Sequence, residues 1–351
     1  MYKAKRIALK VRLALVVCLL VPILAPTTPA AGGNFRLTKI YGVGVGVWGY
    51  MMDIDSADGY VAVLDPKKGA VRLIDWEKHK RGEWKRLPSI TCSSGTRHIP
   101  ESYSFFHLVP GTDWLIFDHC GNLYVFDFRT NSLVQTLSGS KGDLWALDVS
   151  PDGRYFAVVG AAGVRMYERA AQGFKKMEQW TGPGQSIGPL KFTSDSRELV
   201  GAGPTKGIFV YSASTGKQIA HYDDGEPEVL HMGTSRIVTD ESRAGQSSVV
   251  VRSLSDGHVL RRLPYDQNQV GPASVSPNGN FLAASSCPDP EYSLNSCSLF
   301  SIWDLKTGKL VYQSLRWLHW FNWSGWPIFS ADGKYLILQR IDSIEFYRIE
   351  N

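Results

Sequence analysis

A repeated unit of about 40 residues constrains the fold of this chain more than any other feature. In its clearest copy, Asp143–Glu168, two runs of alternating apolar residues flank the turn Ser150-Pro151-Asp152-Gly153. A second turn at Ala161-Ala162-Gly163 opens a third run. Runs with a period of two that are bounded by Pro, Asp and Gly predict antiparallel strands joined by hairpins. One such unit cannot bury its own apolar faces, so it needs similar units beside it.

Seven copies of this unit follow one another. The residues that close their first turns lie 39 to 54 positions apart and are Gly59, Gly111, Gly153, Ser196, Ser235, Gly279 and Gly333. This spacing, with four strands per unit, predicts an all-β fold: a seven-bladed β-propeller of four-stranded antiparallel blades over residues 34–351. The last copy, Trp326–Glu350, has only three strands, whereas Asn34–Val43 is an unassigned strand. We predict that this N-terminal strand completes the last blade and closes the ring.

Several short segments resemble the WD40-like β-propeller family. They are SPDGRYFAV, SPNGNFLAA and SADGKYLIL at three first turns, and IWDLKTGKLV at Ile302–Val311. The resemblance covers nearly the whole chain after its first 31 residues. Only one unit carries the Trp-Asp pair, so the related YVTN-type and quinoprotein-type propellers of the bacterial periplasm remain alternatives.

The first 31 residues have the pattern of a secretory signal peptide. Five basic residues precede or begin the short apolar run Leu13–Leu24, and Thr28–Gly32 is rich in small residues. A membrane-spanning helix needs about 20 apolar residues, so we expect cleavage rather than stable membrane insertion. The mature protein would be periplasmic or secreted.

Removal of this segment changes the charge of the protein. The chain has 38 Lys and Arg residues against 33 Asp and Glu residues, and five of the basic residues lie in the segment. The remaining 33 basic and 33 acidic residues balance. The basic surface that nucleic-acid binding requires is therefore missing, and we predict no nucleic-acid partner.

Four cysteines remain in the mature chain. An even number of cysteines in an exported protein favours disulfides over free buried thiols. Cys287 and Cys297 enclose a short loop and form the natural pair, which leaves Cys92 to pair with Cys120. Neither the Cys nor the His spacing fits zinc, so we predict no metal site.

The irregular stretches of the chain should gather on one face. In a four-stranded blade, the connection between the second and third strands and the link to the next blade lie at the same end of the sheet. Pro88–Ser102, Ser286–Ser298 and Arg316–Gly325 all fall there. The candidate binding residues of this face are Arg97, His98, Tyr292, Trp317, His319, Trp320 and Trp323. Exposed aromatic rings suit sugars or the apolar side chains of a protein partner, and the alternative is that they fill the gap between two blades.

A second group of polar residues should lie near the ring axis. His107, Asp148, Lys191 and His231 occupy corresponding positions on the expected innermost strands. Converging polar side chains can bind a ligand or transfer protons, but polar residues between blades more often bond to backbone or to each other.

These patterns predict function less sharply than fold. Gly44–Gly49 fits GxGxxG, but no helix follows, so we predict no nucleotide or other cofactor. We expect a monomeric, non-enzymatic binding platform that presents its loop-rich face to a protein or glycan partner. The alternative is a periplasmic propeller enzyme resembling quinoprotein amine dehydrogenases or propeller lactonases.

Overall fold

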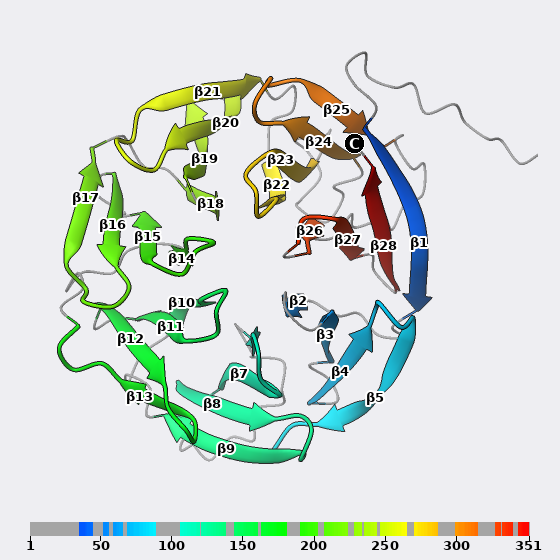
Figure 1. Cartoon of the computed structure of the whole chain (residues 1–351), viewed down its shortest axis with the longest axis vertical. Coiled ribbons are helices and arrows are strands. Elements are labelled where there is room, and N and C mark those ends of the chain that lie inside the picture. Colours follow the sequence, from blue (N-terminus) through cyan, green and yellow to red (C-terminus); the bar gives the residue numbers. More distant parts are fainter. Residues whose placement is uncertain are drawn as a thin grey trace, which may run out of the picture.

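The computed structural model describes most of the chain after residue 34. The described ranges are 35–44, 52–55, 59–65, 69–88, 106–119, 121–137, 144–160, 163–180, 190–202, 207–223, 228–233, 235–243, 246–264, 270–286, 299–314, 327–330, 332–339 and 343–350. Seven four-stranded antiparallel sheets stand around a common axis (Figure 1). No helix occurs in these ranges. The predicted seven-bladed β-propeller is confirmed.

Each of the first three blades is built from four consecutive strands, the innermost first. Blade 1 consists of β2 (Met52–Asp55), β3 (Tyr60–Asp65), β4 (Ala70–Asp75) and β5 (Lys80–Arg86). Blade 2 consists of β6 (Phe106–Val109), β7 (Trp114–His119), β8 (Asn122–Asp127) and β9 (Ser132–Leu137). Blade 3 consists of β10 (Leu144–Val149), β11 (Tyr155–Gly160), β12 (Gly163–Arg169) and β13 (Phe174–Lys176).

Blades 4 to 6 repeat this order. Blade 4 consists of β14 (Leu190–Phe192), β15 (Glu198–Ala202), β16 (Ile208–Ser212) and β17 (Gln218–Tyr222). Blade 5 consists of β18 (Glu228–Met232), β19 (Arg236–Arg243), β20 (Gln246–Ser253) and β21 (Val259–Pro264). Blade 6 consists of β22 (Val270–Val275), β23 (Phe281–Ser286), β24 (Leu299–Asp304) and β25 (Leu310–Gln313).

Blade 7 combines the two ends of the described chain. Its inner strands are β26 (Pro327–Phe329), β27 (Tyr335–Gln339) and β28 (Ser343–Glu350), and its outermost strand is β1 (Arg36–Gly44). β1 pairs antiparallel with β28 from Arg36 opposite Glu350 to Gly44 opposite Ser343, as the blue and red arrows of Figure 1 show. The predicted completion of the last blade by the N-terminal strand is therefore confirmed.

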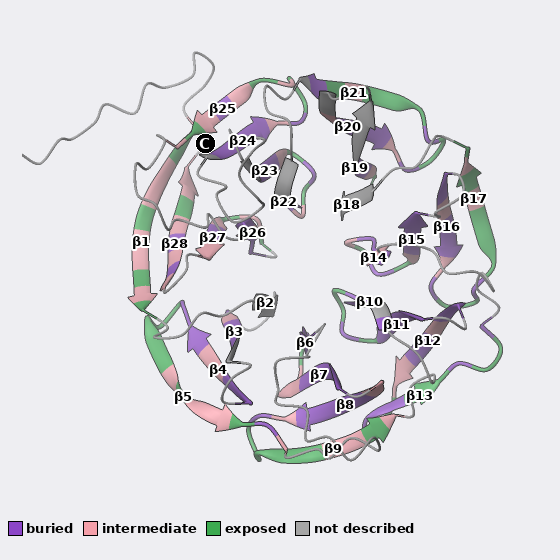
Figure 2. Ribbon diagram, turned by 180° about the vertical axis from the view of Figure 1, so that it is seen from behind, coloured by how far each residue is buried: buried purple, intermediate pink, exposed green. Residues whose placement is uncertain are grey.

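The hydrophobic core is divided among the interfaces between blades. Seven clusters of buried residues occur in the described ranges, and each joins two neighbouring blades. The middle strands are buried and the outermost strands are largely exposed or half-buried (Figure 2). Because each blade covers one face of each of its two neighbours, ring closure is needed to complete the core.

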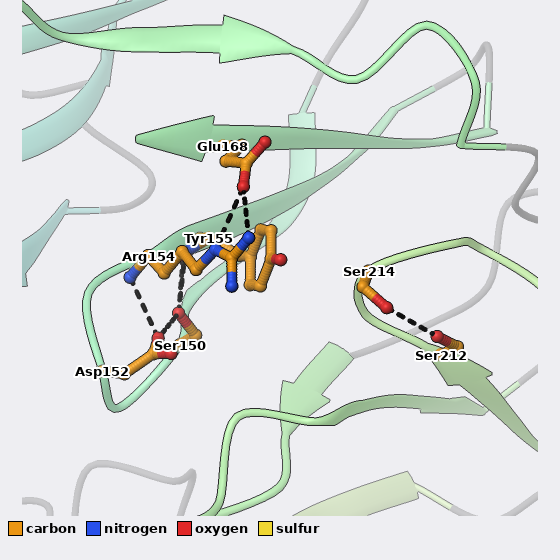
Figure 3. A network of polar contacts seen from close by, with 7 residues as sticks. All are labelled: Ser150, Asp152, Arg154, Tyr155, Glu168, Ser212 and Ser214. Carbon is orange, nitrogen blue, oxygen red and sulfur yellow. Dashed lines mark hydrogen bonds and ion pairs between the residues drawn. The ribbon is translucent and has the colours of Figure 1, made fainter. Parts of the chain in front are cut away.

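Serine and aspartate side chains fix the inner hairpins. Ser150 Oγ accepts a hydrogen bond from Tyr155 N at 2.8 Å and donates to Asp152 Oδ1 at 2.6 Å (Figure 3). Asp152 Oδ1 also accepts from Arg154 N at 2.9 Å. The same set of bonds recurs in three further blades, around Thr193, Ser276 and Ser330. These bonds explain why S/T-x-D/N sequences mark the first turns.

The residue that closes this turn takes a positive φ. Gly153 has φ 65°, and a Cβ there would lie 2.1 Å from the carbonyl oxygen of Pro110 in blade 2. Ser196 adopts the same conformation, with φ 62°, although it is not glycine. Its hydroxyl accepts a hydrogen bond from Asp152 N at 3.0 Å, which links the turns of blades 3 and 4. This bond offsets part of the strain of a left-handed serine.

Candidate functional site

The antiparallel blades give the ring two faces that differ in the strand connections they carry. The turns between first and second strands, such as Ser150–Gly153, and those between third and fourth strands define what we call the turn face. The connections between second and third strands, and the links between blades, define the connection face. The predicted binding residues belong to segments that begin and end on the connection face.

All of these binding residues lie outside the described ranges, and so do the four cysteines. They are Cys92, Arg97, His98, Cys120, Cys287, Tyr292, Cys297, Trp317, His319, Trp320 and Trp323. The strands that flank them are described: β5 ends and β6 begins at the connection face, as do β23 and β24, and β25 and β26. The disulfide pairing and the contacts of the tryptophan cluster remain predictions.

The predicted axial residues do occupy equivalent places in the ring. Each of them pairs with a residue of the second strand of its blade. The pairs are His107 with Ile116, Asp148 with Ala157, Lys191 with Val200 and His231 with Val238. All four residues therefore lie on innermost strands (Figure 1). The placement of their side chains near a channel remains a prediction.

Asp148 joins blade 3 to blade 4 through both of its carboxylate oxygens. Lys191 Nζ donates to Asp148 Oδ1 at 2.7 Å, and the backbone N–H of Phe192 donates to Asp148 Oδ2 at 2.8 Å. The Asp148 side chain is 11% exposed and that of Lys191 is 32% exposed. Both oxygens of this buried carboxylate therefore have charged or backbone donors in the next blade. We call this arrangement the inter-blade clamp.

A neutral counterpart of this clamp joins blades 6 and 7. Ser274 occupies the position of Asp148 on β22, where it pairs with Ala283. Its Oγ accepts a hydrogen bond from Phe329 N at 3.4 Å, just as Asp148 accepts from Phe192 N. The position therefore has a recurrent structural task, which is to accept the backbone N–H of the next innermost strand.

Two buried ionisable residues on β7 are absent from the sequence-based predictions. Asp118 and His119 are 6% and 2% exposed and lie at the connection end of this strand. Buried Asp and His residues are uncommon unless they are bonded, and their position next to one another is a signal that the sequence does offer. They place a buried acid and a buried imidazole at the connection-face end of β7.

Blade 5 has two further unpredicted features. Arg252 is 1% exposed, and it occupies the strand position at which other blades carry Phe126, Tyr211 or Trp303. The β19–β20 ladder runs to Arg243 opposite Gln246, over eight residues per strand. The second strands of blades 3 and 6, β11 and β23, have six residues, so β19 extends about 7 Å farther at the connection face.

Among the described residues, no group of three or more His, Cys, Asp or Glu side chains is arranged to hold a metal ion. In that part of the chain, no helix is long and apolar enough to cross a membrane.

Comparison with known proteins gives no closer assignment. No family model matches the chain, and no curated protein matches its sequence.

Proposed function

We propose that this protein is an exported, non-enzymatic binding platform that contacts a protein or glycan through its connection face. The observation that carries this proposal is the inter-blade clamp. Asp148 and Lys191 are two of the four axial candidates for acid–base chemistry, and their hydrogen bonds join two blades. The structural role of these two axial residues favours the connection face as the surface for recognition.

Two features support the choice of this face. Among the described hairpins between second and third strands, β19–β20 has the longest ladder, and it extends to this face with the polar sequence Asp240–Ser247. The tryptophan-rich segment Arg316–Gly325 links strands β25 and β26, which end and begin at the same face. Aromatic and arginine side chains are enriched in recognition surfaces, because they supply contact area and hydrogen bonds together.

The export and family assignments belong to the same proposal. The N-terminal segment would be cleaved near residue 31, the mature protein would be periplasmic or secreted, and the fold would be WD40-like. Edman sequencing of the mature protein tests the cleavage. If the two disulfides Cys92–Cys120 and Cys287–Cys297 are present, an alkylating agent will modify these four cysteines only after reduction.

A propeller enzyme of the periplasmic type is the second candidate. Asp118 and His119 favour it, because a buried acid and imidazole at the connection face are suited to proton transfer. In that case the residues would work with a ligand or cofactor bound at that face.

Bound metal and cofactor separate the two candidates. We would purify the mature protein from its native compartment and measure its metals by elemental analysis and its absorption spectrum. The platform predicts a colourless protein with no stoichiometric metal. A stoichiometric metal ion or a quinone-like chromophore would contradict the platform and support the enzyme.

A further inference from the structure

Two arginines on the outer part of blade 1 point to the same side of its sheet. Arg72 lies on β4, and Arg81 on β5 pairs with Ile74, two residues farther along β4. Alternate residues of a strand share a face, so Arg72, Ile74 and Arg81 lie on one side. Ile74 and Trp84 belong to the cluster between blades 7 and 1, which shows that this side faces blade 7.

Arg72 is held against an aromatic ring. Its guanidinium carbon lies 4.2 Å from the ring centroid of Trp84, the residue directly opposite it in the ladder. The Nε atom of Arg72 is buried and has no hydrogen-bond partner in the described structure. Stacking on Trp84 fixes the plane of the guanidinium, but it does not satisfy its N–H groups.

Arg81 is anchored by a different contact. Its Nη1 donates a hydrogen bond to the carbonyl oxygen of Gly44 at 3.0 Å, at the end of β1. This bond uses one of the five guanidinium donors, and the side chain is otherwise exposed. The hydrogen bond therefore holds a guanidinium with free donors at the junction of blades 7 and 1.

The positive charge of Arg81 lies close enough to Arg72 to affect its pKa. The pKa of Arg72 is lowered first by burial and then by the positive charge of Arg81. Within the described ranges, no carboxylate forms an ion pair with either guanidinium. Two arginines that are fixed close together without a carboxylate between them favour an anion that both can bind.

We propose that Arg72, Arg81 and Trp84 form a binding site for a sulfate or phosphate group at the rim of the ring. A tetrahedral oxyanion would accept hydrogen bonds from both guanidiniums and remove the repulsion between them. The neighbouring charges favour its approach, because β5 carries Lys80, Arg81, Lys85 and Arg86 against the single acid Glu83. The group would be an inorganic anion or a sulfate or phosphate ester of a larger molecule.

This site is independent of the proposed platform. It lies on the outer strands of blade 1, where β4 and β5 meet the end of β1 (Figure 1). The platform uses the connection face instead, so either assignment can fail without the other.

The test is titration of the mature protein with sodium sulfate and sodium phosphate by isothermal titration calorimetry, against sodium chloride at matched ionic strength. We expect saturable binding of sulfate or phosphate and none of chloride. Arg72→Gln and Arg81→Gln should each raise Kd at least tenfold. Arg129→Gln removes another exposed arginine, on blade 2, and should leave Kd within twofold.

If Arg72→Gln destabilises the fold, the Kd of Arg81→Gln tests the site alone. Arg81 is exposed, so its replacement removes no core contact. Unchanged binding in Arg81→Gln, or no saturable binding by the wild-type protein, would overturn the proposal. The same titrations with a sulfated and a phosphorylated monosaccharide identify the source. If a monosaccharide ester binds more tightly than the inorganic anion, and Arg81→Gln abolishes this binding, the natural ligand is an ester. If the ester and the inorganic anion bind with equal affinity, the natural ligand is the free anion.

Discussion

The hydroxyl of Ser150 holds the inner hairpin of blade 3 together. It is fully buried, accepts a hydrogen bond from Tyr155 N and donates one to Asp152 (Figure 3). We predict that Ser150→Ala lowers the free energy of unfolding by ~1–2 kcal/mol, because Tyr155 N loses its partner in a buried position. The measurement is chemical denaturation at pH 7.

Ser214 provides the matched control for this substitution. Its hydroxyl lies 3.2 Å from that of Ser212, also shown in Figure 3, but the residue is exposed, so water can replace the bond. Ser214→Ala should change the free energy of unfolding by less than ~0.5 kcal/mol. Equal losses in the two variants would refute the role assigned to Ser150.

Asp75 links the stability of blade 1 to pH. Burial acts to raise the pKa of Asp75, but hydrogen bonds from the side chain and backbone of Lys78 outweigh it, and the net pKa is lowered. A carboxyl with a lowered folded-state pKa stabilises the fold above its unfolded pKa of about 3.9, and this contribution disappears as pH falls through the folded pKa.

Asp75→Asn should therefore be less stable than wild type at pH 7, and the difference should shrink steadily below about pH 4. Urea denaturation of both proteins between pH 3 and pH 7 measures it. A difference that stays constant, or that grows in acid, would contradict the assigned sign.

At the scale of the element, β1 connects three blades. Phe35 and Leu37 pack in the cluster between blades 6 and 7, whereas Tyr41 and Val43 pack in the one between blades 7 and 1. A β-bulge between Lys39 and Tyr41 shifts the register, which lets residues on both sides of it face opposite neighbours. Tyr41 also stacks on His79 of blade 1, with ring centroids 4.7 Å apart.

Deletion of residues 35–44 should strongly destabilise the protein, because it exposes the edge of β28 and opens two inter-blade clusters. We expect a lower midpoint in guanidinium denaturation and concentration-dependent association by light scattering. A chain that begins at Asn34 serves as the control. Equal midpoints for the two chains would show that β1 does not close the ring.

The fold was predictable from sequence because it repeats. The unassigned strand at the N-terminus and the missing strand at the C-terminus together implied the pairing of β1 with β28. The positions of Arg252 and of the Arg72–Trp84 stack were not predictable in this way. They depend on the register of paired strands, which in blade 1 includes an irregularity between Arg72 and Ile74 that no local pattern marks.

At the scale of the whole molecule, the topology separates a turn face from a connection face. These two faces follow from strand order alone. The sequence therefore correctly predicted that the strands flanking the irregular segments end and begin at the connection face. The correspondence of His107, Asp148, Lys191 and His231 was also predictable, but the role of Asp148 was not. A sequence pattern locates a carboxylate on a strand, whereas its partners, Lys191 Nζ and Phe192 N, come from the packing of the next blade.

The most direct test of the platform compares its two faces in a binding measurement. The mature protein would be immobilised and exposed to an extract of its native compartment and to a glycan array, and bound partners would then be purified for a measurement of Kd. Trp320→Ala and Trp323→Ala change the segment that links β25 to β26, whereas Arg197→Ala and Lys334→Ala change exposed residues of the turn face. We predict at least a tenfold loss of affinity for the tryptophan variants alone. Equal affinities in all four variants and the wild type would contradict the assignment of the connection face as the binding surface.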